Sequence, residues 1–154
     1  MPKRSAVAAF AVITLLGPAM AQSSSRAETA IRDALMKWTT HFNTGATREI
    51  CGLFAPELRY DYRGHPERGF EDVCRLLQRS LSDRTKTYFY SLQIREIIVS
   101  GDLAVVRLAW TLKVIPVGST DEMVSEEPGI DIFRANDDPD RMVGILLRLR
   151  RHRR

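Results

Sequence analysis

The sequence predicts a single α+β domain in which helices precede an antiparallel sheet. Apolar residues recur at helical spacing before residue 82, and with a period of two afterwards. Helices grouped ahead of a run of strands are typical of α+β domains. The third observation is the length of the chain. If the first 21 of its 154 residues are a leader, 133 residues remain, which is enough for one domain with one core.

The first 21 residues have the three-part build of a secretory signal peptide. A basic start is followed by an apolar stretch from Ala6 to Leu16 and by Ala19-Met20-Ala21. The apolar stretch is too short for the roughly 20 residues that a membrane-spanning helix needs. We therefore expect cleavage after Ala21, a Ser-rich linker at 22–25, a domain at 26–149, and a periplasmic or secreted location.

Charge is concentrated at the two ends of the chain. The formal net charge of +4 falls to +2 without the leader and to −3 without the five arginines of LLRLRRHRR as well. A body of this charge is not typical of nucleic-acid binders, so we expect no nucleic-acid partner. For the basic tail at 150–154, a solvated end is favoured over contact with an anionic membrane.

The two cysteines, Cys51 and Cys74, leave two alternatives open. In an oxidising compartment they would form one disulfide, which by loop-closure entropy contributes about 3 kcal/mol. Alternatively, they are separate buried thiols that act as small hydrophobic residues.

Three helices are expected, at about 26–43, 47–54 and 70–81. The first has apolar positions on one face at Ile31, Leu35, Trp38 and Phe42. Pro56 prevents the second from continuing. The segment 63–69, RGHPERG, is expected to form a turn before the third helix.

Strands are expected at about 58–62, 87–99, 103–115, 129–135 and 142–149, with a polar loop at 116–127. In the third of these strands, apolar residues alternate with a more polar set that comprises Val105, Arg107, Ala109, Thr111 and Lys113. Such alternation is typical of a sheet that is covered on one face only. Helices on one face of a bent sheet would enclose a cavity.

Five strings carry a family resemblance: ETAIRDALMKWTTHFNTG, ICGLFAPELRYDYRG, GFEDVCRLLQRSL, REIIVSGDLAVVRLAWTL and EPGIDIFR. They span roughly Glu28 to Arg134 and resemble SnoaL-like, ketosteroid-isomerase-like members of the nuclear transport factor 2-like superfamily. The resemblance implies a cone-shaped fold, with three N-terminal helices packed on a curved antiparallel sheet. It does not imply one reaction, because the superfamily hosts isomerases, cyclases, epoxide hydrolases and domains with no known reaction.

The resemblance also suggests site positions. The acid that stabilises the oxyanion in the steroid isomerase lies in a strand motif similar to GIDIF, which places Asp131 there. An acid in apolar surroundings can stay neutral and donate a hydrogen bond. The isomerase's tyrosine position is Trp38, and its general-base position falls on Tyr62, beside Asp61. Two of the three residue types differ, so the isomerase's own reaction is not expected.

Asp131 is accordingly predicted to face the cavity as an acid or oxyanion donor. The alternative is that it pairs with an arginine such as Arg107 on a neighbouring strand, or caps a backbone group. Asp61 or His65 would move protons. Side chains expected to orient or line a ligand are Trp38, Tyr60, Tyr62, Trp110 and Phe133. The histidines and cysteines lack metal-ligand spacing, and phosphate-loop and nucleophile motifs are absent from the sequence, so neither a metal nor a cofactor is expected.

The sequence therefore favours an exported domain that binds an apolar small molecule, with cofactor-free isomerisation, cyclisation or hydration as the chemistry if it is an enzyme. The alternative is a non-catalytic association or scaffold module. In that case the open sheet face, which carries Val105, Arg107, Ala109 and Thr111, would pair with a second copy. A homodimer of this kind is compatible with either reading.

Overall fold

The computed structural model describes residues 18–62, 64–136 and 142–149. Two helices and six strands follow one another in the order α1 (Pro18–Asn43), β1 (Phe54–Tyr62), β2 (Arg68–Gly69), α2 (Phe70–Ser82), β3 (Lys86–Ser100), β4 (Leu103–Pro116), β5 (Met123–Ala135) and β6 (Met142–Leu149). The first 17 residues of the expected leader and the basic tail at 150–154 lie outside the described residues.

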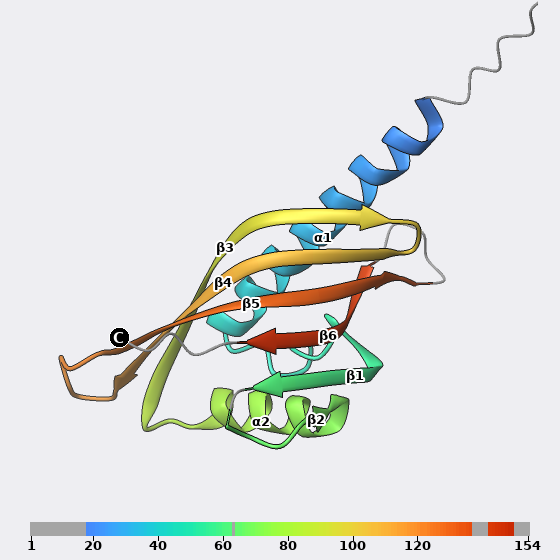
Figure 1. Ribbon diagram of the computed structural model, residues 1–154. Coiled ribbons are helices and arrows are strands. Elements are labelled where there is room, and N and C mark those ends of the chain that lie inside the picture. The colour runs from blue at the N-terminus through green and yellow to red at the C-terminus, as the bar shows by residue number, and fades with distance from the viewer. Residues whose placement is uncertain (1–17, 63, 137–141, 150–154) are drawn as a thin grey trace, which may run out of the picture.

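The six strands form one curved sheet in the order β2-β1-β6-β5-β4-β3. All neighbouring strands are antiparallel except β1 and β6, which are parallel. Both helices pack against the sheet, α1 on β3 and β6, and α2 on β1 and β2 (Figure 1). The α+β class and the curved sheet predicted from the sequence are confirmed.

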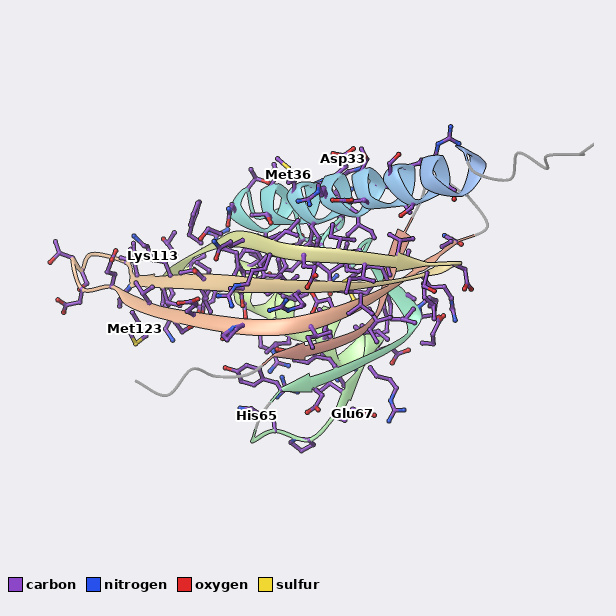
Figure 2. All side chains as sticks on the ribbon, turned by 45° about the horizontal axis from the view of Figure 1, so that its top comes forward. Asp33, Met36, His65, Glu67, Lys113 and Met123 are labelled. Atoms are coloured by element: carbon purple, nitrogen blue, oxygen red, sulfur yellow. A yellow bond between two sulfur atoms is a disulfide. The ribbon has the colours of Figure 1, made fainter. Side chains whose placement is uncertain are left out.

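The core lies between the helices and the inner face of the sheet. On β4 the inner side chains are Ala104, Val106, Leu108 and Trp110, as the alternation predicted. The inner face of α1 buries Ile31, Leu35, Trp38 and Phe42. On its other side, Met36 and Asp33 point away from the sheet (Figure 2).

The second expected helix, at 47–54, is absent, so the described residues form two helices where three were predicted. Residues 47–53 form successive turns, in which Gly52 N–H donates to the Glu49 carbonyl at 2.9 Å. Ile50, Leu53 and Phe54 are nevertheless buried, as the helical pattern had suggested. A stretch this short cannot offset the cost of helix nucleation, so tertiary contacts decide its backbone.

The other element boundaries also move. α1 begins at Pro18, which makes residues 22–25, expected as a linker, helical. β1 begins at Phe54 and accommodates Pro56 within a register shift between Phe54 and Arg59. β5 begins at Met123, so the loop expected at 116–127 is shorter and Glu127 belongs to a strand.

Cys51 and Cys74 form a disulfide, with a Cα–Cα distance of 5.6 Å. It joins the turns after α1 to the middle of α2. Of the two alternatives left open by the sequence, the structure has the bonded one. Within the described part of the chain, no helix is long and apolar enough to cross a membrane.

Candidate functional site: an aromatic cavity

A cavity of about 200 Å³ lies between the two helices and the inner face of the sheet. Half of its lining side chains are aromatic, and those that the structure describes include no charged one. They are Trp38, Phe42, Leu53, Phe54, Tyr60, Val73, Leu76, Leu77, Ser80, Tyr88, Tyr90, Trp110, Leu112 and Leu147. A ligand in this space would be held mainly by burial of apolar surface.

The aromatic wall is built around Trp38, near the end of α1. Its ring lies 5.1 Å from that of Trp110 and 5.8 Å from that of Tyr90, measured between centroids. Its indole N–H donates to the Ile50 carbonyl at 2.8 Å. Because that bond occupies its one donor, Trp38 offers a ligand its ring surface and not a hydrogen bond.

Tyr90 is fixed in place by the last residue of α1. The Asn43 side chain accepts from the backbone N–H of Tyr90 and donates to its carbonyl, both at 2.8 Å. The Tyr90 ring then packs edge-on against Phe42, with centroids 4.7 Å apart. This pairing sets the strand against the helix where the cavity is most aromatic.

The lining carries hydroxyl groups on Tyr60, Tyr88, Tyr90 and Ser80, and the phenols of Tyr60 and Tyr90 are the most perturbed. Burial raises the pKa of both phenols well above the ordinary value, and the negative charge of Glu127 adds to the rise. Tyr60 also contributes to the raised pKa of Tyr90, so the two hydroxyls belong to one electrostatic cluster. Both hydroxyls therefore remain protonated and can act as hydrogen-bond donors.

Glu127, whose charge acts on both phenols, is bonded to Tyr62. The side chain of Glu127 is 5% exposed, and its Oε1 accepts from the Tyr62 hydroxyl at 3.1 Å. Glu127, Gly129 and Asp131 share the inner face of β5, since alternate residues of a strand point the same way. Gly129 presents no side chain between the two acids.

Asp131 is 1% exposed, and neither of its carboxyl oxygens has a hydrogen-bond partner among the described residues. Burial raises its pKa to about 8, a rise that the nearby Trp110 indole opposes without meeting hydrogen-bond geometry. Its cross-strand partners are Val106 and Leu147. An acid in such surroundings stays neutral at pH 7.

Asp131 is inward-facing, as expected, but it is not among the residues that line the cavity. Leu147 and Trp110, which neighbour it, do line the cavity. The alternative is wrong in both forms. Arg107 pairs with Glu96 on the outer face, at 2.6 Å, and neither carboxyl oxygen of Asp131 bonds to an arginine or to a backbone group among the described residues. A direct role for Asp131 toward a ligand stays a prediction.

The other residues proposed from the sequence divide into two groups. Trp38, Tyr60 and Trp110 line the cavity, whereas Phe133 is fully buried in the core beside it. Tyr62 is not a lining residue, but its ring stacks on that of Tyr60, with centroids 6.1 Å apart.

Asp61 and His65 lie away from the cavity. Asp61 lies on the opposite face of β1 from Tyr60 and Tyr62. His65 is exposed in the β1–β2 connection (Figure 2), where its ring stacks on Tyr62 with centroids 5.3 Å apart. Glu67, in the same connection, pairs with Arg59 at 2.9 Å. A proton-carrying role for Asp61 or His65 stays a prediction, and the cavity brings neither into its lining.

Sequence reasoning missed Glu127 and Tyr90. Glu127 had been assigned to a loop, although it continues the inward set Asp131 and Phe133 at a period of two. Tyr90 was included in a strand without a role, because its contact with Asn43 spans 47 residues of sequence. Across the described ranges, no three His, Cys, Asp or Glu side chains cluster to hold a metal.

A curved six-stranded sheet with helices on one face and a cavity between them is the nuclear transport factor 2-like fold. The SnoaL-like domain model matches residues 35–143, which is more than half of the chain. The chain therefore belongs to the SnoaL-like family. A search of curated proteins finds no significant match.

Solved structures agree on the fold at low sequence identity. A conserved protein from Planctomyces limnophilus is 16% identical with a TM-score of 0.72, covering 81% of this chain and 97% of its own. A candidate scytalone dehydratase from Novosphingobium aromaticivorans is 16% identical with a TM-score of 0.71, and the match covers 87% of this chain and 89% of the dehydratase. A ketosteroid isomerase-like protein from Erwinia carotovora is also 16% identical, with a TM-score of 0.64, and the match covers 82% of this chain and 96% of the isomerase-like protein.

Proposed function

We propose that this protein is an exported domain that binds an apolar small molecule in the cavity between its helices and its sheet. The observation that carries the proposal is the aromatic lining of a space of about 200 Å³. An engineered apolar cavity of about 150 Å³ is known to bind benzene, so a space of this size suits a ring compound. Export is supported by the leader-like start of the chain and by the disulfide, which persists in oxidising compartments.

Catalysis is the finer part of the proposal. Cofactor-free isomerisation, cyclisation or hydration would use a neutral Asp131 as the acid, acting at the wall formed by Trp110 and Leu147. Its burial and unpaired oxygens support such a role, since a protonated carboxyl can donate. Tyr60 would orient the ligand from the lining.

Filling the cavity tests the proposal. A panel of apolar metabolites is expected to raise the melting temperature of the unmodified protein, by an amount equivalent to about 2.7 kcal/mol at a ligand concentration 100 times Kd. Leu77→Trp, on the α2 wall, is expected to abolish the shift. Met36→Trp, at an exposed position on the outer side of α1, serves as the control and is expected to keep it. No shift with any compound would refute the proposal.

A second candidate function, homodimerisation through the outer sheet face, has its own support. Ile98 and Ile130 are 52% and 46% exposed on that face, where cross-strand pairing also aligns Val105 and Ile132 with Ile98. Exposed apolar side chains grouped in this way are typical of interaction surfaces. Ala109, which had been assigned to the same surface, is only 3% exposed.

Light scattering at micromolar concentration tests the dimer. Ile98→Lys is expected to shift the protein to the monomer, whereas Met36→Lys on the opposite side is expected to leave the dimer intact. A monomeric unmodified protein would exclude this candidate at that concentration.

A further inference from the structure

A second hollow, an open groove, lies beside the disulfide. Its volume of about 620 Å³ falls within the range of roughly 300–1,000 Å³ that small-molecule sites have. Its described lining comes from the turns after α1, the start of β1, the first residue of α2 and the ends of β5 and β6 that face them. Phe54 is the one residue that this lining shares with that of the aromatic cavity.

The two sulfur-bearing residues of the disulfide are placed unequally toward this groove. Cys51 is half-buried and belongs to the lining. Cys74, one helical turn after the start of α2, is 7% exposed and is not a lining residue. The rate of thiol–disulfide exchange depends on which sulfur the attacking thiolate can reach. A thiol that enters the groove therefore meets the sulfur of Cys51, and the sulfur of Cys74 is the leaving group.

The disulfide is the covalent link between those turns and α2. α2 has 13 residues, a length at which isolated helices are marginal in water, and its N-cap residue Gly69 makes no side-chain cap. A hydrogen bond from the Gln78 side chain to the Thr47 carbonyl, at 3.3 Å, also joins the two segments, but it is exposed to solvent. Opening the disulfide therefore removes the strongest tether between the turns and this helix.

We propose that the groove admits a low-molecular-weight thiol, which exchanges with the disulfide at Cys51 and so frees α2. The incoming thiolate forms a bond to the sulfur of Cys51 as the bond between Cys51 and Cys74 breaks. Cys74 leaves as a thiolate and takes a proton from water. One mixed disulfide replaces one protein disulfide, so the step needs no further oxidant or reductant.

Cys51 is thus a modification site, and the modification acts on the aromatic cavity. α2 contributes Val73, Leu76, Leu77 and Ser80 to the cavity wall. When the helix is less firmly held, this wall is less firmly held too, and a ligand in the cavity loses affinity. This consequence for the ligand rests on the proposed function, whereas exchange at Cys51 does not.

Peptide mapping by mass spectrometry tests the site of exchange. The folded protein is exposed briefly to reduced glutathione, and acid then stops the reaction. Glutathione is expected on Cys51 about tenfold more often than on Cys74, because the groove exposes one sulfur and not the other. In urea, which opens both sulfurs to solvent, the preference is expected to disappear. Equal adducts in the folded protein, or a preference that persists in urea, would overturn the proposal.

Filling the groove tests the route. Pro56 is exposed and lines the groove, so Pro56→Trp is expected to slow exchange with glutathione by about tenfold. Met36→Trp, on the outer side of α1, is the matched control and is expected to keep the rate of the unmodified protein. An unchanged rate in Pro56→Trp would show that the thiol does not arrive through the groove. Should this variant fail to fold, the mapping on the unmodified protein still decides.

Hydrogen exchange measures whether α2 is freed. Cys74→Ser holds glutathione on Cys51, because no second thiol remains to displace it. Amide hydrogens of α2 are expected to exchange about tenfold faster in this adduct than in the unmodified protein, while those at 31–42 in α1 keep their rates. Unchanged rates in α2 would refute its release. Neither measurement uses a cavity ligand, so a failure here leaves the proposed function standing, and a cavity that binds nothing leaves exchange at Cys51 standing.

Discussion

The two faces of the sheet treat charge in opposite ways. On the outer face, acids and bases form ion pairs that solvent reaches, as in Arg107 with Glu96 at 2.6 Å and Arg95 with Glu126 at 3.4 Å. On the inner face, two acids of the same strand are buried, and one of them, Asp131, has no hydrogen-bond partner among the described residues. A charged side chain is tolerated where solvent reaches it. A buried acid must either be protonated or accept a hydrogen bond.

The largest expected effect comes from the proton on Asp131. Because burial raises its pKa from 3.8 to about 8, the folded protein keeps this proton over a pH range in which the unfolded chain has released it. The free energy of unfolding should therefore fall as pH rises from about 4 to about 8, by about 1.4 kcal/mol per pH unit from this group. Below and above that window the group contributes no slope.

Asp131→Asn is expected to remove this slope, and to be more stable than the unmodified protein at pH 8 by an amount on the order of several kcal/mol. Urea unfolding at a series of pH values measures it. Asp33→Asn, at an exposed position on α1, is the matched control and should retain the slope (Figure 2). If the free energy of unfolding depends on pH in the same way for Asp131→Asn and for the unmodified protein, Asp131 is not neutral in the folded protein.

The disulfide is expected to have the next largest effect, because it secures the helix that covers the inner face. α2 contributes four cavity residues, Val73, Leu76, Leu77 and Ser80. Replacing both cysteines by alanine should reduce the free energy of unfolding by about 3 kcal/mol and weaken ligand binding in the cavity. Urea unfolding measures the loss of stability and calorimetry the loss of ligand affinity. If both are unchanged in the variant without cysteines, the disulfide does not stabilise α2.

The smallest effect is expected on the outer face. Glu96→Gln removes the partner of Arg107, but both side chains are about half exposed, so the loss should stay within about 1 kcal/mol. The change should also fade as salt is added. A loss of several kcal/mol would mean that this face is covered in solution, as the proposed dimer would cover it.

Much of the fold could be predicted because periodic patterns reflect which side faces the core. The alternation at 103–115 predicted β4 and its inner residues, and the spacing of Ile31, Leu35, Trp38 and Phe42 predicted most of α1. The turns at 47–53 were misassigned because a buried turn and a short helix place apolar residues at similar intervals. Glu127 was missed because its charge and its polar neighbours favoured a loop, although it lies at a period of two from Asp131 and Phe133.

The sequence by itself determined the class of fold, the family and the inward direction of Asp131, because local periodicity and local strings carry that information. Only the tertiary structure decided three hydrogen bonds. They are those of Asn43 with the Tyr90 backbone, of the Tyr62 hydroxyl with Glu127, and of the Trp38 indole with the Ile50 carbonyl. These contacts join residues 12 to 65 positions apart. Their geometry depends on how α1, β1, β3 and β5 pack together, which no local pattern specifies.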